Sequence, residues 1–303
     1  MTYNEAIDVL QTSVAVAAPL LLAALGGLVA ERAGVFSIGL EGYMLAGAFT
    51  GFVVAHFTNP WIGMLAAAAG GACVAIVHGV LSIRLRVDQI VSGIAMTILA
   101  LGTTGYFNDA TLHRQGQLVQ IKSLGSIRLP GLSRLPAIGK ILFTQSVFVY
   151  IAIIATLVLG AVFRWTKWGL WIHSAGEQPA ACEARGLRVP VIRMWSVVFS
   201  GAAAGLGGGM LTLAVVSSFV DNMTNGAGFI ALAAIIFAGW RLAGTVAACL
   251  LFGVAQSAQI WANTVGVAAP AQLLGMSPYV AAIVVLAVRG KASRVPAFLG
   301  KPL

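Results

Sequence analysis

The sequence predicts an all-α polytopic membrane protein, and its composition indicates this class in two ways. Of the 303 residues, 59% are hydrophobic and only 9% are charged, whereas a soluble domain usually carries about 25% charge. The mean hydropathy is +0.93. At roughly 20 residues per transmembrane helix, the apolar content suffices for about nine spans. The composition therefore excludes an ordinary soluble protein and predicts a single transmembrane domain over residues 1–303.

Nine apolar windows are candidates for membrane helices. In chain order they are 9–30, 36–57, 61–83, 90–107, 145–163, 194–217, 226–240, 243–263 and 276–288. The seventh is short, because its residues at ~1.5 Å rise reach only about 22 Å across a hydrocarbon core of ~30 Å. We predict a short true crossing there, with a re-entrant half-helix as the alternative.

Basic residues predict how these helices are oriented. If the nine spans cross the membrane in alternating directions, thirteen of the 18 Lys and Arg residues lie on one side of the membrane. The other five lie in one loop on the opposite side. Because Lys and Arg accumulate on the cytoplasmic side, the N-terminus is predicted outside and the C-terminus in the cytoplasm. Membrane orientation then explains the net charge of +9, and nucleic acid is not expected as a partner.

Three stretches outside the windows stand out. Residues 108–144 are interrupted by Gly and Pro and are predicted to be an external loop or lid. Residues 164–193 form the long cytoplasmic loop, and residues 289–303 form a basic cytoplasmic tail. A faint similarity between residues 38–80 and 229–256 indicates a weak internal repeat, a feature that many transporters contain.

The motifs of several enzyme classes are missing from the sequence. There is no GxxxxGK[ST] phosphate-binding loop, so the chain is not expected to hydrolyse ATP. HExxH and GxSxG are absent too, and the three Cys residues lack metal-ligand spacing. We therefore expect no catalytic residue, metal or cofactor in this chain. The first ten residues contain no Lys or Arg, which favours a retained first helix over a cleaved leader.

Glycines recur at helical spacing in the sixth window. Gly201, Gly205 and Gly209 form overlapping GxxxG motifs, which let helix backbones approach closely in lipid. Packing within the bundle is the favoured interpretation, and a homodimer seam is the alternative. The glycine run also predicts a hinge near Gly207.

Ionisable residues inside the windows are few, and each is a candidate functional residue. Glu41 lies near the start of the second window, where a charge is costly unless it is paired or faces a cavity. One interpretation is structural, with Glu41 meeting Arg32 or a free backbone amide at a helix break. The other places Glu41 on a translocation path. In the fourth window, Thr97 suits a neutral polar solute, although Thr in membrane helices more often bonds a backbone carbonyl.

A family resemblance rests on three stretches of the chain. They are ERAGVFSIGLEG at residues 31–42, the segment 169–186 with AGEQPAACEARG at 175–186, and GFIALAAIIFAG at 228–239, which Trp240 and Arg241 follow. Together they resemble the permease subunits of bacterial ABC importers of the branched-chain amino acid and ribose type. Within that superfamily they most resemble the nucleoside and simple-sugar permeases, and the similarity spans roughly residues 14–290.

The resemblance implies a non-catalytic permease of the bacterial inner membrane that carries a nucleoside or simple-sugar-like solute. Its implied partners are a second permease subunit in a homo- or heterodimer, a cytoplasmic ABC ATPase that binds ATP and Mg, an extracytoplasmic solute-binding protein, and membrane lipid. One alternative is an ABC permease for branched-chain amino acids or another small solute. An alternative of another class is a self-sufficient channel or ion-coupled carrier.

The resemblance also assigns roles to individual residues. It implies a cytoplasmic coupling segment with a short helix at about 178–185 that inserts into a groove of the ATPase. The coupling residues are Glu177, Gln178, Pro179, Ala180, Ala181, Arg185 and Gly186. The translocation path is expected along the second, fourth and seventh windows, and its candidate residues are Ser37, Glu41, Thr97 and Phe229.

The chain departs from the family at two of these positions. Ser37 stands where the family usually has Asn, and Thr97 occupies a second position that is often Asn. A hydroxyl lacks the paired donor and acceptor with which an amide reads a base or sugar edge. The identity of the solute is therefore the least determined part of the prediction.

Overall fold

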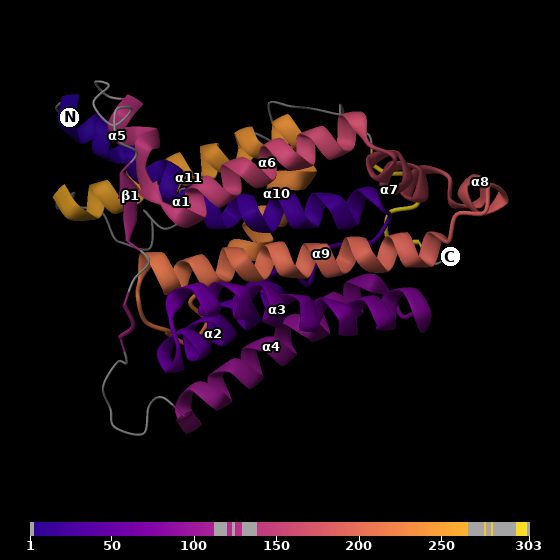
Figure 1. Ribbon diagram of the computed structural model, residues 1–303, viewed down its shortest axis with the longest axis horizontal. Helices are drawn as coiled ribbons and strands as arrows, with labels where there is room; N and C mark the ends of the chain where they lie inside the picture. Colours follow the sequence, from indigo (N-terminus) through magenta and orange to yellow (C-terminus); the bar gives the residue numbers. More distant parts are fainter. Residues whose placement is uncertain are drawn as a thin grey trace.

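The computed structural model describes residues 3–111, 120–122, 125–128, 138–265, 276, 280 and 295–301. Over this part of the chain, long helices run roughly parallel along the longest axis of the molecule (Figure 1). Seven of the described helices are long and apolar enough to cross a membrane. An eighth apolar helix is shorter. The ninth predicted window, 276–288, lies almost entirely outside the described residues.

The long helices follow the predicted windows, with ends that differ by a few residues. In chain order they are α1 (Tyr3–Arg32), α2 (Leu40–Phe57), α3 (Pro60–Gly79), α4 (Gln89–Thr111), α6 (Val147–Trp165), α9 (Val189–Met210) and α11 (Leu242–Val265). Single π-helical turns extend two of them, η1 (Val80–Arg84) after α3 and η3 (Leu211–Val215) after α9. The short apolar helix is α10 (Ala227–Phe237).

Helices α1 and α9 form the centre of the bundle. α1 contacts α9, α10, α11 and α6, and α9 contacts α2 and α3 as well. Figure 1 places α2, α3 and α4 on one side of this pair and α6 and α11 on the other. Residues 17–25 of α1 are apolar and nearly all buried. A helix that is apolar on every side is suited to such a central position.

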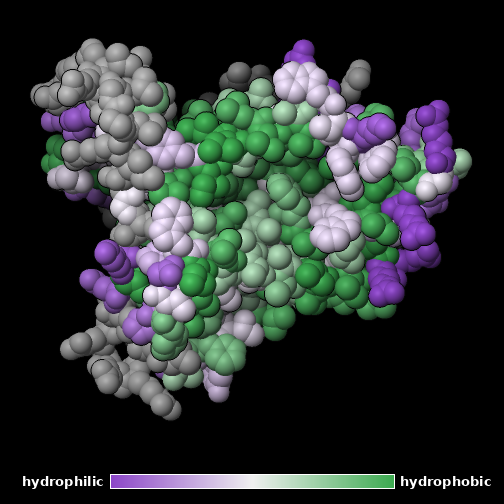
Figure 2. Space-filling model, viewed as in Figure 1, coloured by the Kyte–Doolittle hydropathy of each residue, from purple (hydrophilic) through white to green (hydrophobic). Residues whose placement is uncertain are grey.

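One end of the bundle, which we name the basic end, collects the positively charged helix termini. Arg32, Arg84 and Arg164 end α1, η1 and α6, while Arg188 and Arg241 immediately precede α9 and α11. Figure 2 shows hydrophilic residues gathered at this end and a hydrophobic belt along the helices. Two short helices, α7 (Lys167–Glu177) and α8 (Pro179–Ala184), also lie there (Figure 1). The assignment of this end to the cytoplasm stays a prediction.

The predicted loops contain more regular structure than expected. α4 continues through Thr111, so the loop predicted at 108–144 begins too early. Within that range lie α5 (Ile138–Phe143) and an antiparallel ribbon of β1 (Ser126–Arg128) and β2 (Thr144–Ser146), in which Ser126 pairs with Ser146. The loop predicted at 164–193 likewise ends too late, because α9 already begins at Val189.

Candidate functional site

Two helices begin beside each other inside the bundle. α2 begins after an irregular segment that turns at Gly34, where φ is +96°, and α10 begins after Gly226, where φ is 84°. A Cβ atom on Gly228 would lie 2.5 Å from the Cα of Glu41, so the two first turns touch. α2 runs away from the basic end and α10 runs toward it. The positive ends of both helix dipoles therefore point at one place.

Glu41 fills the space between these two helix starts. Its side chain is 3% exposed. Oε1 accepts hydrogen bonds from Thr224 Oγ1 at 2.6 Å and from the backbone N–H of Gly226 at 2.9 Å, and Oε2 accepts one from the N–H of Gly228 at 2.7 Å. These are donors that a helix start leaves without partners, and a carboxylate is the favoured ligand for them. We name Glu41, Thr224, Gly226 and Gly228 the helix-start site.

The geometry of Glu41 corresponds to the structural interpretation of this residue, because two of its three described partners are free backbone amides at a helix break. Arg32 is not one of them, since its Nε donates to the carbonyl oxygen of Trp240 at 2.9 Å. Sequence reasoning did not find Thr224 or Gly226. The one sequence signal for them was the pair Asn225-Gly226 directly before the apolar run of α10, because an Asn-Gly pair is typical of a turn.

Two of the other path residues lie near the helix-start site. A Cβ on Gly42 would lie 2.9 Å from the Cα of Thr97, which brings α4 against the start of α2. The Thr97 hydroxyl donates to the carbonyl of Gly93 at 3.1 Å, within its own helix. Phe229 follows Gly228 and is 45% exposed.

Ser37 belongs to a second buried cluster, closer to the basic end. Its N–H donates to Oε1 of Glu31 at 3.3 Å, and Trp240 Nε1 donates to Oε2 of Glu31 at 2.6 Å. Glu31 is fully buried. This carboxylate therefore connects the end of α1, the segment before α2 and the turn after α10. Sequence reasoning missed its role, although Glu31 and Trp240 stood in or next to the stretches of the resemblance.

A third polar cluster joins α3 and α4 beside the π-helical turn η1. Ser92 Oγ is 3.1 Å from His78 Nδ1 and 3.0 Å from Ser82 Oγ, and all three side chains are buried. Next to it, Gln89 Oε1 accepts from the N–H of Phe36 at 2.7 Å. The segment before α2 is thus held from two sides. The spacing of four between His78 and Ser82 was the only sequence signal for this cluster.

The predicted coupling residues form a corner at the basic end. Thr166 Oγ1 caps α7 by accepting from the N–H of Gly169 at 3.3 Å, and α8 falls within the helix predicted at 178–185. A hollow of about 520 Å³ lies between α7 and α8, and four of the seven predicted coupling residues line it: Glu177, Gln178, Ala181 and Arg185. Cys182 is buried at the same place, and this burial raises the pKa of its thiol.

Residues 295–301 of the predicted tail hold this corner against the bundle. The N–H of Phe298 donates to the carbonyl of Gly176 at 2.9 Å, and the N–H of Gly300 donates to that of Gly34 at 3.3 Å. Arg193 Nη1 donates to the carbonyl of Lys301 at 3.0 Å. Arg193, the last residue of the predicted cytoplasmic loop, is only 1% exposed. It lies in the first turns of α9, where the tail contacts it.

The glycines of the sixth window lie against α3 of the same chain. A Cβ on Gly201 would lie 2.5 Å from the carbonyl oxygen of Gly71, and one on Gly209 would lie 2.5 Å from the Cβ of Ala67. A Cβ on Gly205 would clash with the carbonyl oxygen of Ala67. Among the described residues, no group of three His, Cys, Asp or Glu side chains could hold a metal ion.

Comparison with known proteins assigns the chain to a family. Residues 9–288 match the family described as branched-chain amino acid transport system / permease component. The chain belongs to this permease family. The predicted resemblance is thereby confirmed, and the seven long apolar helices make this permease a multi-pass protein of the inner membrane.

Several curated relatives are similar to the permease over nearly its whole length. The guanosine ABC transporter permease protein NupQ of Bacillus subtilis (strain 168) is 37% identical over 94% of either chain. The nucleoside ABC transporter permease protein NupC of Lactococcus lactis is 35% identical over 94% of this chain and 90% of its own. The guanosine ABC transporter permease protein NupP of Bacillus subtilis is 28% identical over 78% and 69%. No solved structure gives a significant match.

Proposed function

We propose that this permease is the membrane subunit of an ABC importer for nucleosides. The observation that carries the proposal is the 35–37% identity to two permease proteins named for nucleoside or guanosine transport, over 94% of the chain. The helix-start site fits a neutral solute, because Glu41 already occupies the donors that an anion would use.

A second, homologous permease subunit would complete the membrane part. In Bacillus subtilis, NupQ and NupP are both named guanosine ABC transporter permease proteins, and this chain is similar to each, at 37% and 28% identity. We therefore favour a heterodimer in which this chain takes the place of NupQ. A separate ATPase and an extracytoplasmic solute-binding protein would supply the energy and deliver the solute.

The translocation path in this proposal runs past the helix-start site. Thr97 and Phe229 lie on the two helices that meet Glu41, and the exposed ring of Phe229 provides a face on which a nucleobase can stack. Ser37 lies further toward the basic end, behind the Glu31–Trp240 hydrogen bond. We expect the path to open when the helix-start site moves relative to the cluster of Glu31, Ser37 and Trp240.

Coupling to ATP would pass through the corner of α7 and α8. In our proposal, closure of the ATPase moves Glu177 to Gly186. Gly176 is in direct contact with the carbonyl oxygen of Arg32, so movement of the corner would reach the end of α1. From there the Arg32–Trp240 hydrogen bond leads to the end of α10. The corner would thus be connected mechanically to the helix-start site.

Reconstitution of the full importer tests this function. The permease, its second subunit, the ATPase and the binding protein are incorporated into liposomes, and ATP-dependent uptake of guanosine, ribose and leucine is measured. We expect guanosine uptake to exceed uptake of the other two solutes. Uptake of ribose or leucine without guanosine would overturn the nucleoside assignment, and guanosine uptake by the permease alone, without nucleotide, would favour a carrier.

The same liposomes test the coupling segment. Replacing residues 177–186 by a Gly/Ser linker should abolish guanosine-stimulated ATP hydrolysis. A Gly/Ser replacement of the exposed dipeptide Arg86-Val87, also at the basic end but outside the corner, serves as the control. Stimulated hydrolysis that survives the 177–186 replacement would remove the coupling role from this segment.

A further inference from the structure

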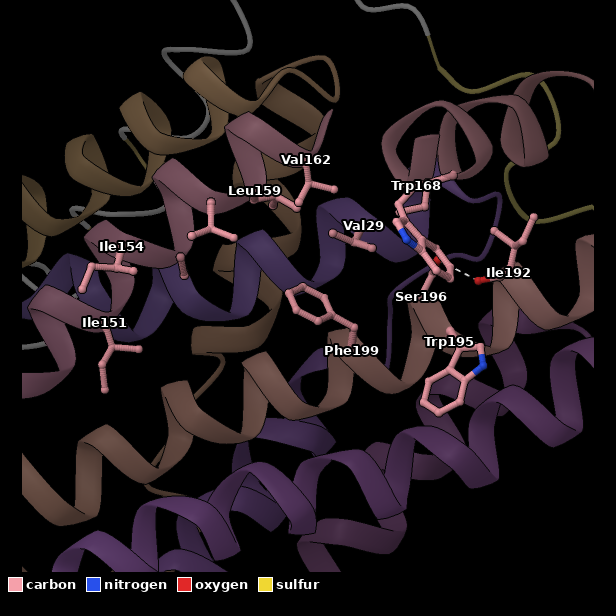
Figure 3. A pocket seen from close by; sticks show the side chains of 13 residues that line it. Val29, Ile151, Ile154, Leu159, Val162, Trp168, Ile192, Trp195, Ser196 and Phe199 are labelled. Carbon is pink, nitrogen blue, oxygen red and sulfur yellow. Dashed lines mark hydrogen bonds between the residues drawn. The ribbon is translucent and has the colours of Figure 1, made fainter. Parts of the chain in front are cut away.

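An apolar groove runs along the outer surface of the bundle between α6 and α9. Figure 3 shows side chains of both helices pointing into it, with Val29 of α1 at its base and Trp168 of α7 at one end. Its volume is about 620 Å³. The groove lies apart from the helix-start site, which is formed by α2 and α10.

The lining of this groove excludes a polar solute. All but one of its lining residues are hydrophobic, and the exception is Ser196. The Ser196 hydroxyl donates to the carbonyl of Ile192 at 2.8 Å, within its own helix (Figure 3). Ser196 therefore offers no free donor, and the other donors of the lining are the indole N–H groups of Trp168 and Trp195. The rest of the groove is apolar and suits a hydrocarbon ligand.

The dimensions of the groove match acyl chains. Along α6 it extends from Ile151 to Val162, about 16 Å at the helical rise and therefore close to one leaflet of a ~30 Å hydrocarbon core. An acyl chain that lies along the groove would therefore reach from the membrane interface to about the middle of the bilayer.

The mouth of the groove lies at the basic end and has the character of a membrane interface. Trp168 and Trp195 flank it and are 59% and 66% exposed. Trp side chains prefer the level of the lipid headgroups. Lys167 precedes Trp168, and Arg188 lies about two helical turns before Trp195. Both cations are exposed, and within the described part of the chain no acidic residue forms an ion pair with them.

We propose that this groove binds an anionic phospholipid from the leaflet at the basic end. Its acyl chains lie along α6 and α9, and its headgroup phosphate lies against Lys167 and Arg188. Because α7 leads directly into α8, the bound lipid holds the α7–α8 corner at the membrane surface. That last effect rests on the proposed function of the corner, whereas lipid binding does not.

Native mass spectrometry of the purified full-length permease tests the binding. Delipidated protein is titrated with phosphatidylglycerol or phosphatidylcholine of identical acyl chains. We expect selective retention of phosphatidylglycerol, and an about ten-fold loss of that retention in K167Q/R188Q. The control R84Q/R86Q removes the same charge from the same end on the α3–α4 side, and it should retain the lipid like the wild type.

A steric variant examines the groove itself. Ala155→Trp fills it and should abolish retention, whereas Ala95→Trp on the exposed face of α4 should not. Equal retention of both lipids by the wild type, or unchanged selectivity in K167Q/R188Q, would overturn the proposal. A disulfide between Ile154→Cys and the second permease subunit in the assembled importer would also overturn it, by assigning the groove to a subunit interface. None of these outcomes requires transport activity, so a failure of the proposed nucleoside function is recognised separately.

Discussion

Glu41 is a buried carboxylate whose described partners are all hydrogen-bond donors. Thr224, Gly226 and Gly228 each give one hydrogen to it, and together they use both of its oxygens. In hydrocarbon, neither the charge nor the free amides of α10 could remain unpaired without a large cost. The hydrogen bonds therefore satisfy both the Glu41 carboxylate and the free amides at the start of α10, so neither is left unpaired in the membrane.

We predict that Glu41→Gln destabilises the permease by about 3 kcal/mol, because one amide nitrogen would then face a backbone donor and the charge would be lost. The measurement is the free energy of unfolding in detergent. Asp88→Asn is the matched control. Asp88 also accepts from two backbone amides, those of Ile90 at 2.8 Å and Val91 at 3.0 Å, but it is exposed, and Asn caps a helix equally well. Equal stability of both variants would contradict the prediction.

At the scale of elements, the bundle depends on close contacts between helix backbones. α9 carries glycines on the side that faces α3, and a carbonyl of α3 occupies the place where a Cβ on Gly205 would be. Lipid provides no hydrophobic drive to bring helices together, so contact area and dispersion have to hold them. Backbone atoms cannot rotate out of the way as a side chain can.

Gly205→Ala should therefore separate α3 from α9 and cost about 1–3 kcal/mol, the usual range for overpacking. Gly102→Ala provides the comparison, because an added Cβ there meets no atom within 4 Å and Ala favours the helix. Thermal unfolding of both purified variants measures the difference. A Gly205 variant as stable as the Gly102 variant would show that α9 can shift without loss of contact.

At the scale of the whole molecule, the distribution of basic residues predicts the orientation. Nearly all described basic helix termini lie at one end, whereas the ends of α2, α4, α9 and α11 at the opposite end contain no Lys or Arg. By the positive-inside rule, we predict that the basic end faces the cytoplasm. This places the α7–α8 corner and the tail where an ATPase could reach them.

Fusion reporters check this orientation. Green fluorescent protein attached after Leu303 should be fluorescent, because it folds in the cytoplasm but not after export through the general secretory route. Alkaline phosphatase attached after Phe57, at the end of α2, should be active. The reverse pattern in both fusions would invert the molecule and remove the proposed ATPase contact from the α7–α8 corner.

The helices could be predicted from the sequence because their apolar length alone identifies them. The start of α2 could not, since Phe36 and Ile38 are as apolar as the helix that follows. That start depends on contacts with Gln89 and Glu31. The partners of Glu41 lie 183 to 187 residues away in the chain, and no local pattern reveals such a pairing. The helix at 178–185 could be predicted from the family resemblance. The burial of Arg193 could not, because Arg193 donates a hydrogen bond to a tail residue more than 100 positions later in the chain.

The long sequence separation at the helix-start site has a consequence for biogenesis. During synthesis at ~5–20 residues per second, Glu41 leaves the ribosome roughly 10 to 40 seconds before Gly226. Throughout that interval the second helix carries a carboxylate whose final donors do not yet exist. The nascent N-terminal half must therefore stay beside water or the translocon rather than settle in lipid, and a truncated chain that ends before α10 should be a preferred substrate of membrane quality-control proteases.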